Sequence, residues 1–252
     1  MFKLLTLATA LLFLPGAVLA DTTLHFALQK DGQSGHSVVY VRPGEVRTDN
    51  SGGTWMLYKA AQDTLYVVQP ERKSYIRVDR ERIKQLGKQM AQARQRYQAE
   101  LQKLPPKQRA QMKKSLGNLL QAPEQKKPLK LQESGGTEQV SGVTCQSGRI
   151  VQDGQTLQSV CIAKPGALGM SGKEFSSLKS LYGLMSDLEA STGFGPGPMP
   201  DLSRLNGVPI RLKSAQSGAS QHLTAVGHGS LSDKLFRIPS SYQQRTPGRQ
   251  NG

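Results

Sequence analysis

The stretch TWMLYKAAQDTLYVVQPERKSYIRV, residues 54–78, decides the fold class. Its segments Thr54–Ala60, Thr64–Gln69 and Ser74–Val78 are rich in β-branched and aromatic residues and are joined by short polar connections. Connections this short allow only antiparallel neighbours. Similar segments, separated by turn formers such as Asp31-Gly32 and Pro43-Gly44, lie upstream at Thr22–Lys30, His36–Arg42 and Glu45–Asp49. Residues 22–78 are therefore predicted to form an antiparallel meander.

The predicted strands are apolar on both faces. Trp55 and Leu57 alternate with Met56 and Tyr58, so neither side of this strand is polar. A sheet with one face in water should instead alternate between apolar and polar residues. We therefore expect the sheet either to be covered on both faces or to line an internal cavity. The sequence leaves open which face points inward.

The hydrophobic period changes after residue 78. From Asp79, a residue type favoured at helix N-caps, apolar residues follow at spacings of three and four as far as Leu104. Pro105-Pro106 ends this helix, and proline suits the first turn of the next one. Residues 79–121 are therefore predicted to form a helical hairpin inserted between two groups of strands. A coiled-coil dimer is an alternative for the same apolar stripe.

Positive charge is concentrated in this insertion. Residues 71–130 contain 17 Lys and Arg against five Asp and Glu, in a chain of formal net charge +15. Such a field favours an anionic membrane surface or an acidic envelope protein as partner. Nucleic acid is not expected as a partner, because the N-terminus has the features of an export signal. Alternatively, these charged residues form a solvated helical face that only keeps the protein in solution and binds no partner. The residues expected to contact an anionic surface are Lys84, Lys88, Arg94, Lys113 and Lys114.

The N-terminus has the features of a secretory signal peptide. Lys3 precedes an apolar run over residues 4–14, and small side chains, Val18 and Ala20, occupy positions −3 and −1 of a cut before Asp21. The run is shorter than the roughly 20 residues that a spanning helix needs. We expect cleavage after Ala20 and a periplasmic protein in which residues 21–252 form one domain, with a disordered tail at 243–252.

Cys145 and Cys161 are the two cysteines of the chain and flank the turn signal Asp153-Gly154. A three-residue loop centred on residue 153 would place them directly opposite each other across a hairpin. In an exported protein, we expect such a pair to form a structural disulfide. A redox-active pair is the alternative, but the sequence lacks the Cys-x-x-Cys spacing that would favour it.

The second half of the chain adds strands at Glu138–Gln152 and Thr156–Ala163, a helix from about Lys173 to Ser191, and a closing hairpin over residues 208–226. It contains no pattern typical of an enzyme. The four histidines do not share a metal-ligand spacing, and residues 169–172, GMSG, lack the spacing of a serine nucleophile elbow. We therefore expect no metal, no cofactor and no enzymatic activity.

Several motifs resemble those of known exported families. Residues 39–49, VYVRPGEVRTD, resemble the second-and-third-strand signature of the LolA-type lipoprotein carriers, and residues 58–68 and 73–75 continue it. The sequence is also similar to a periplasmic family, the domain of unknown function numbered 4412. Features of that family appear as Val140–Cys145 (VSGVTC), Asn206–Ile210 (NGVPI) and Phe236–Tyr242 (FRIPSSY).

The resemblance implies an α+β fold: a strongly curved antiparallel sheet, an unclosed barrel of LolA-like form, with helices on its concave side. It implies a non-catalytic binding protein that holds an apolar or acylated ligand, such as a lipid or a lipoprotein segment, between sheet and helices. Arg47 is carried over from the motif as a polar contact. The candidate apolar contacts are Trp55, Leu57, Tyr66 and Tyr75 on the sheet and Phe175, Leu178 and Met185 on the helix.

The disulfide hairpin and the long basic insertion depart from the pattern of the carriers. They support an alternative function of another class. The protein would then be an envelope protein–protein interaction or stress-sensing module, which docks acidic partners through its basic hairpin and holds no ligand.

Overall fold

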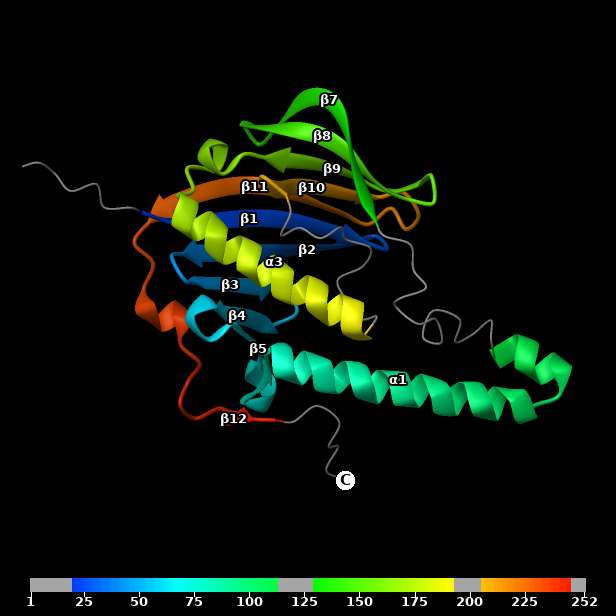
Figure 1. The fold of residues 1–252 in the computed structure, drawn as a ribbon. Coiled ribbons are helices and arrows are strands. Elements are labelled where there is room, and N and C mark those ends of the chain that lie inside the picture. The colour runs from blue at the N-terminus through cyan, green and yellow to red at the C-terminus, as the bar shows by residue number, and fades with distance from the viewer. Residues whose placement is uncertain (1–19, 113–128, 193–204, 246–252) are drawn as a thin grey trace, which may run out of the picture.

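The computed structural model describes residues 20–112, 129–192 and 205–245 (Figure 1). Twelve strands of these residues form one sheet in the order β12-β6-β5-β4-β3-β2-β1-β11-β10-β9-β8-β7. Every neighbouring pair is antiparallel except β12 and β6, which run parallel. The predicted α+β class, with a large, unclosed and mainly antiparallel sheet, is confirmed.

The N-terminal half of the sheet is the predicted meander. Its strands are β1 (Asp21–Lys30), β2 (Gln33–Arg42), β3 (Glu45–Asn50), β4 (Trp55–Lys59), β5 (Thr64–Gln69) and β6 (Ser74–Val78). Turn chemistry explains why these strands reverse so tightly. Asp31 and Gly32 are both left-handed, with φ of 52° and 77°, as the favoured two-residue hairpin turn requires. Short 3-10 turns over 60–62 and 70–72 make the reversals from β4 to β5 and from β5 to β6.

The second half of the sheet consists of β7 (Lys130–Val140), β8 (Val143–Gln152), β9 (Gln155–Ala163), β10 (Val208–Ser214) and β11 (Ser220–Gly229). β11 pairs with β1 and so joins the two halves. This end of the sheet curls back on itself. Ser141, in the turn between β7 and β8, donates a hydrogen bond of 2.8 Å to the Leu223 carbonyl of β11, although β9 and β10 lie between β8 and β11.

Helix α3 (Gly172–Thr192) crosses the side toward which the sheet curls, which we call the inner face (Figure 1). The main core lies between α3 and this face. The opposite side, the outer face, is covered near β3–β6 by residues 230–245, which we call the C-terminal strap. The strap contains the 3-10 turn η6 (Asp233–Phe236) and ends in β12 (Gln243–Gln244) beside β6. The predicted cover on both faces is thus present over this part of the sheet.

The position of the strap corrects the prediction made for the C-terminal residues. The sequence indicated a disordered tail from residue 243, but Gln243 and Gln244 pair with Ser74 and Tyr75 of β6. The backbone N–H of Gln243 donates to the Lys73 carbonyl at 2.9 Å, and the N–H of Arg245 donates to the Tyr75 carbonyl at 2.8 Å. The sheet edge therefore orders these residues. Residues 246–252 lie outside the described residues.

Helix α1 (Arg80–Lys103) begins at the predicted cap, where Asp79 accepts a hydrogen bond of 2.8 Å from the Arg82 N–H. Residues 106–112 are again helical after Pro105. The predicted insertion at 79–121 is described only as far as residue 112. Beyond its first turns, α1 leaves the sheet and runs away from the body of the molecule (Figure 1).

The disulfide between Cys145 and Cys161 is present, with the two Cα atoms 5.5 Å apart, but the predicted hairpin geometry is wrong. The loop has two residues, Asp153 and Gly154, both left-handed, and a bulge shifts the register beside Ile150. Cys145 therefore lies opposite Ala163, and Cys161 lies opposite Ser147, which makes the cysteines diagonal neighbours. The bulge matters, because without the extra residue the two side chains would point to opposite faces.

Candidate functional site

The structure does not bring the eight candidate ligand-binding residues together. Cross-strand pairing places Trp55 and Leu57 opposite Val68 and Tyr66, so these side chains share one face of the sheet. That face is the outer one. The covering-helix candidates Phe175, Leu178 and Met185 pack instead on the inner face. The sheet itself therefore separates the two halves of the predicted binding site.

The outer-face candidates are buried by the C-terminal strap. Trp55, Leu57 and Val68 form an apolar cluster with Phe236, a strap residue with no exposed surface. Tyr66 and Tyr75 pack at the border of this cluster, with their ring centroids 5.9 Å apart in an edge-on arrangement. A segment of the chain itself thus occupies the surface that the sequence assigned to a ligand.

Two arginines fasten the strap to the sheet. The Arg42 guanidinium lies 4.0 Å above the Phe236 ring and contacts Asp233 at 2.7 Å, which lowers the pKa of that carboxyl. Arg47 stacks 4.0 Å above the Trp55 ring and donates a hydrogen bond of 2.7 Å to the Leu235 carbonyl. Arg47, expected as a polar contact to ligand, is therefore engaged in holding the strap.

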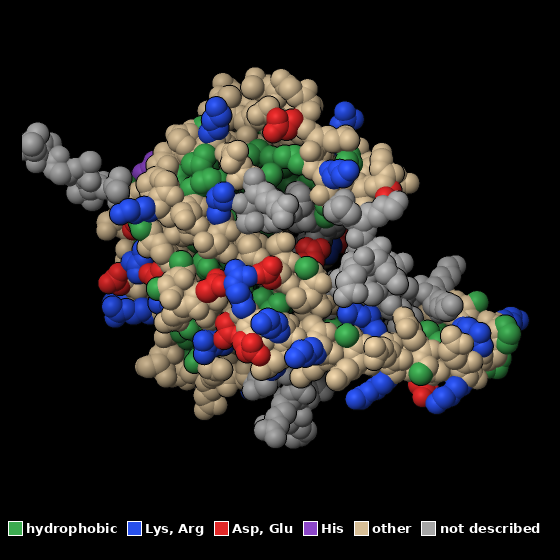
Figure 2. Space-filling view, viewed as in Figure 1, with side chains coloured by type: hydrophobic (Ala, Val, Ile, Leu, Met, Phe, Trp, Pro, Cys, Tyr) green, Lys and Arg blue, Asp and Glu red, His purple; other side chains and the backbone are tan. Residues whose placement is uncertain are grey.

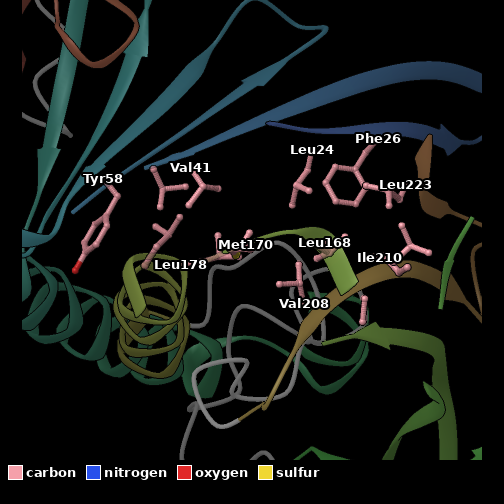
Figure 3. Close-up of a cluster of buried hydrophobic side chains, with 14 of the residues drawn as sticks. Leu24, Phe26, Val41, Tyr58, Leu168, Met170, Leu178, Val208, Ile210 and Leu223 are labelled. Carbon is pink, nitrogen blue, oxygen red and sulfur yellow. The ribbon is translucent and has the colours of Figure 1, made fainter. Parts of the chain in front are cut away.

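On the inner face, side chains of α3 meet the sheet directly. Leu178 and Leu184 are buried in one cluster with Val41 and Tyr58; Figure 3 shows Leu178 directed toward Val41. Phe175 and Met185 are partly buried against the same cluster. Over these strands, the space between helix and sheet is therefore occupied by side chains of the protein.

Residues 80–112, which we call the basic arm, form the second candidate surface. Figure 2 shows Lys and Arg side chains spaced along it, at the lower right. Lys84, Lys88 and Arg96 are exposed and Arg94 is half-buried. None of these four cations forms an ion pair or hydrogen bond with another described residue. Lys113 and Lys114, predicted for the same surface, lie outside the described residues.

The base of the basic arm is fixed to the body by a polar network. Arg80 forms ion pairs with Asp63, at the end of the 3-10 turn before β5, and with Asp187 of α3. Asp63 also accepts a hydrogen bond of 2.8 Å from the Tyr58 hydroxyl. Burial and this bond together raise the pKa of Tyr58 to about 12. The helices α1 and α3 touch at Gly87, where a Cβ atom would lie 3.2 Å from the Ser191 carbonyl oxygen.

The sequence singled out Lys84, Lys88 and Arg94 but missed two features of this surface. Arg96, two residues after Arg94, belongs to the same set of unpaired cations but is not among the predicted contacts. Tyr97 is 49% exposed although it belongs to the apolar stripe of α1. The stripe pattern alone predicts burial for Tyr97, because periodicity does not tell where a helix leaves the body that covers it.

In the described part of the chain, no group of three His, Cys, Asp or Glu residues is arranged to hold a metal ion. None of the described helices carries an apolar stretch long enough to cross a bilayer.

No family model and no curated protein matches this chain. Among solved structures, it is similar to PNGF-II (TM-score 0.42, 8% identity), covering 90% of this chain and 31% of that one. It is also similar to the Pseudomonas aeruginosa MucA/MucB complex (TM-score 0.40, 8% identity; 89% and 57% covered) and to MucB (TM-score 0.37, 10% identity; 89% and 59% covered). The chain thus spans less than two thirds of each of these structures. These TM-scores are below 0.5, and the similarities therefore assign neither a family nor a function.

Proposed function

We propose that this protein is an exported, non-catalytic interaction module that docks an acidic envelope protein through its basic arm. The observation that carries the proposal is a row of cations without a described carboxylate partner along one projecting helix, α1. On the body, Arg42 and Arg47 pair with carboxylates, and cations that pair with no described carboxylate, such as Lys30 and Lys213, lie on different strands. On the arm, Lys84, Lys88, Arg94 and Arg96 have no such partner among the described residues.

Unpaired cations on a projecting helix suit recognition of acidic side chains. A helix of 24 residues is about 36 Å long at 1.5 Å per residue, so it can present its charges along an extended partner. Each exposed ion pair contributes only about 0.5 kcal/mol, and salt screens it. The affinity would therefore arise from several pairs acting together, and the field of the arm would speed association.

An acidic protein fits the arm better than an anionic membrane does. Binding of a helix in the membrane interface grows with the apolar area that it buries among the lipids. Between Ala91 and Glu100, Tyr97 is the one large apolar side chain, and the rest are Ala, Gln and charged residues. The apolar area that the arm could bury among lipids is therefore small, whereas its positive charge is high.

The alternative, a ligand held between sheet and helices, has less support. The candidate residues are split between two faces, the strap covers one group, and α3 packs against the other. Docking through the arm, by contrast, does not require a cavity between the sheet and the helices.

The family resemblance and export are part of the proposal. The β2–β3 motif supplies Arg47, and the Phe236–Tyr242 motif supplies the strap. In the 206–210 motif, Gly207 leaves no room for a side chain, because a Cβ there would lie 2.4 Å from the Ala163 carbonyl oxygen. On the resemblance of these motifs, we propose a relation to the 4412 family and to the LolA-type fold. The disulfide supports an oxidising compartment, and cleavage after Ala20 would leave Asp21, the first residue of β1, at the mature N-terminus.

Charge reversal on the arm tests the docking proposal. The probe is fluorescent poly-L-glutamate, and the variant is Lys84→Glu/Lys88→Glu/Arg96→Glu. At low salt, we expect the wild type to bind the probe and the variant to bind it at least about tenfold more weakly, since three lost pairs of about 0.5 kcal/mol each amount to about 1.5 kcal/mol. Fluorescence anisotropy between 20 and 300 mM NaCl measures both affinity and salt dependence.

The matched control is Lys30→Glu/Arg149→Glu/Lys213→Glu, which changes the net charge equally at exposed positions of the sheet. It should weaken binding much less than the arm variant. Equal weakening by both variants would mean that only total charge matters, and the arm would then be a solvated helix. Binding to phosphatidylglycerol vesicles but not to polyglutamate would replace the acidic protein with a membrane as the partner.

A further inference from the structure

We infer that the arm recognises an amphipathic acidic helix, whose apolar side packs on the exposed middle of the α1 stripe between Met90 and Tyr97. This inference rests on the proposed docking function and names the chemistry of the partner segment. It is carried by an apolar surface and a charge pattern that occur together on one helix face.

The apolar stripe of α1 is covered at its two ends but not in its middle. Ile83 is buried at the base of the arm and Leu101 near its tip, at 2% and 4% exposure. Between them, Met90 is half-buried and Ala93 is exposed. Tyr97 is one of two large apolar side chains of the described residues that are substantially exposed, and both belong to the arm. The arm therefore exposes apolar surface that the rest of the described chain avoids.

The uncovered part of the stripe has the shape of a helix-docking surface. Met90, Ala93 and Tyr97 follow at spacings of three and four, which aligns them along one face of α1. A small side chain at the centre of such a face lets a second helix approach closely. Recognition through apolar anchors at these spacings is a common mode of helix binding.

The charges beside this surface select an acidic partner. At 100° per residue, Arg94 lies on one side of the Met90–Tyr97 line and Arg96 on the other. A docked helix would therefore meet cations along both of its flanks. Residues 80–112 contain nine Lys and Arg against two Glu, so a second copy of the same arm would be repelled. Glu or Asp beside the apolar residues of the partner would instead complement the arm.

Two synthetic helical peptides of equal length and equal negative charge test this inference. One carries leucines at i, i+3, i+4 and i+7, and in the other these leucines are replaced by glutamine. The wild type should bind the leucine peptide about tenfold more tightly, because packing a few apolar side chains is worth roughly 1.4 kcal/mol or more. Tyr97→Gln should remove this preference, whereas Gln92→Ala, on the opposite face of α1, should retain it. Fluorescence anisotropy with labelled peptides measures both affinities.

The outcomes separate this inference from the docking proposal. If the wild type binds both peptides equally well, and the arm charge reversal weakens both, then docking stands and the helix-recognition inference is wrong. If Tyr97→Gln keeps the full preference for leucine, the apolar contact lies elsewhere and the inference is also wrong. If the wild type binds neither peptide nor polyglutamate, both proposals are overturned.

Discussion

Replacing Phe236 with alanine is expected to lower the free energy of unfolding by about 3–5 kcal/mol, the usual cost of truncating a fully buried phenylalanine. The ring has no exposed surface and packs with Trp55, Leu57 and Val68. Truncation would also remove the aromatic face under the Arg42 guanidinium. Urea unfolding of the mature protein, followed by circular dichroism, measures the change.

The neighbouring residue provides the control for this prediction. Arg237 has an exposed side chain, so Arg237→Ala should cost less than about 0.5 kcal/mol. If Phe236→Ala costs no more than Arg237→Ala, the strap is not part of the folded body. The outer-face cluster would then be available to a ligand, as the sequence-based prediction requires.

Removing the disulfide is expected to have the next largest effect. Cys145 and Cys161 are 16 residues apart, and cross-linking a loop of this length stabilises a protein by about 3 kcal/mol. Cys145→Ala/Cys161→Ala should therefore unfold at a clearly lower urea concentration than the wild type. The double variant avoids leaving a single reactive thiol.

The redox state of the two cysteines is checked in the same preparation. Alkylation of denatured, unreduced protein followed by mass analysis should show no modified cysteine, because both are in the disulfide. Treatment with reductant should reproduce the loss of stability of the double variant. Alkylation of both cysteines without reductant would show that the bond does not form in the native protein.

The sequence predicted the elements of this fold better than it predicted their faces. The meander, the Asp79 cap and the third helix depend on local patterns, and these are present. Which side of a strand faces which part of the core depends on the segments that cover the sheet, and these are distant in sequence. Trp55 and Tyr58 are equally apolar and lie on opposite sides of β4, and only the position of the strap and of α3 shows which segment buries each. The strap contributes few residues, and its sequence has no strong period.

Two errors have specific physical causes. The symmetry of the cysteines about residue 153 predicts a three-residue loop, whereas a bulge, which sequence patterns do not mark, shifts the register beside Ile150. The polar composition from residue 243 onward predicts a disordered tail. In the structure, Gln243 and Gln244 are ordered by the edge of β6, a contact distant in sequence. The exposure of Tyr97 is likewise not predictable from the apolar stripe, because it depends on where α1 leaves the sheet.

Native mass spectrometry of protein purified from the periplasm, the compartment we propose for it, tests the central claim that the protein holds no ligand between its sheet and the segments that cover it. We predict a single species with the mass of residues 21–252 containing one disulfide and no bound small molecule. This follows from the packing of α3 and the strap against the two faces. A stoichiometric lipid or acyl adduct, lost only on unfolding, would contradict the account and restore the carrier function.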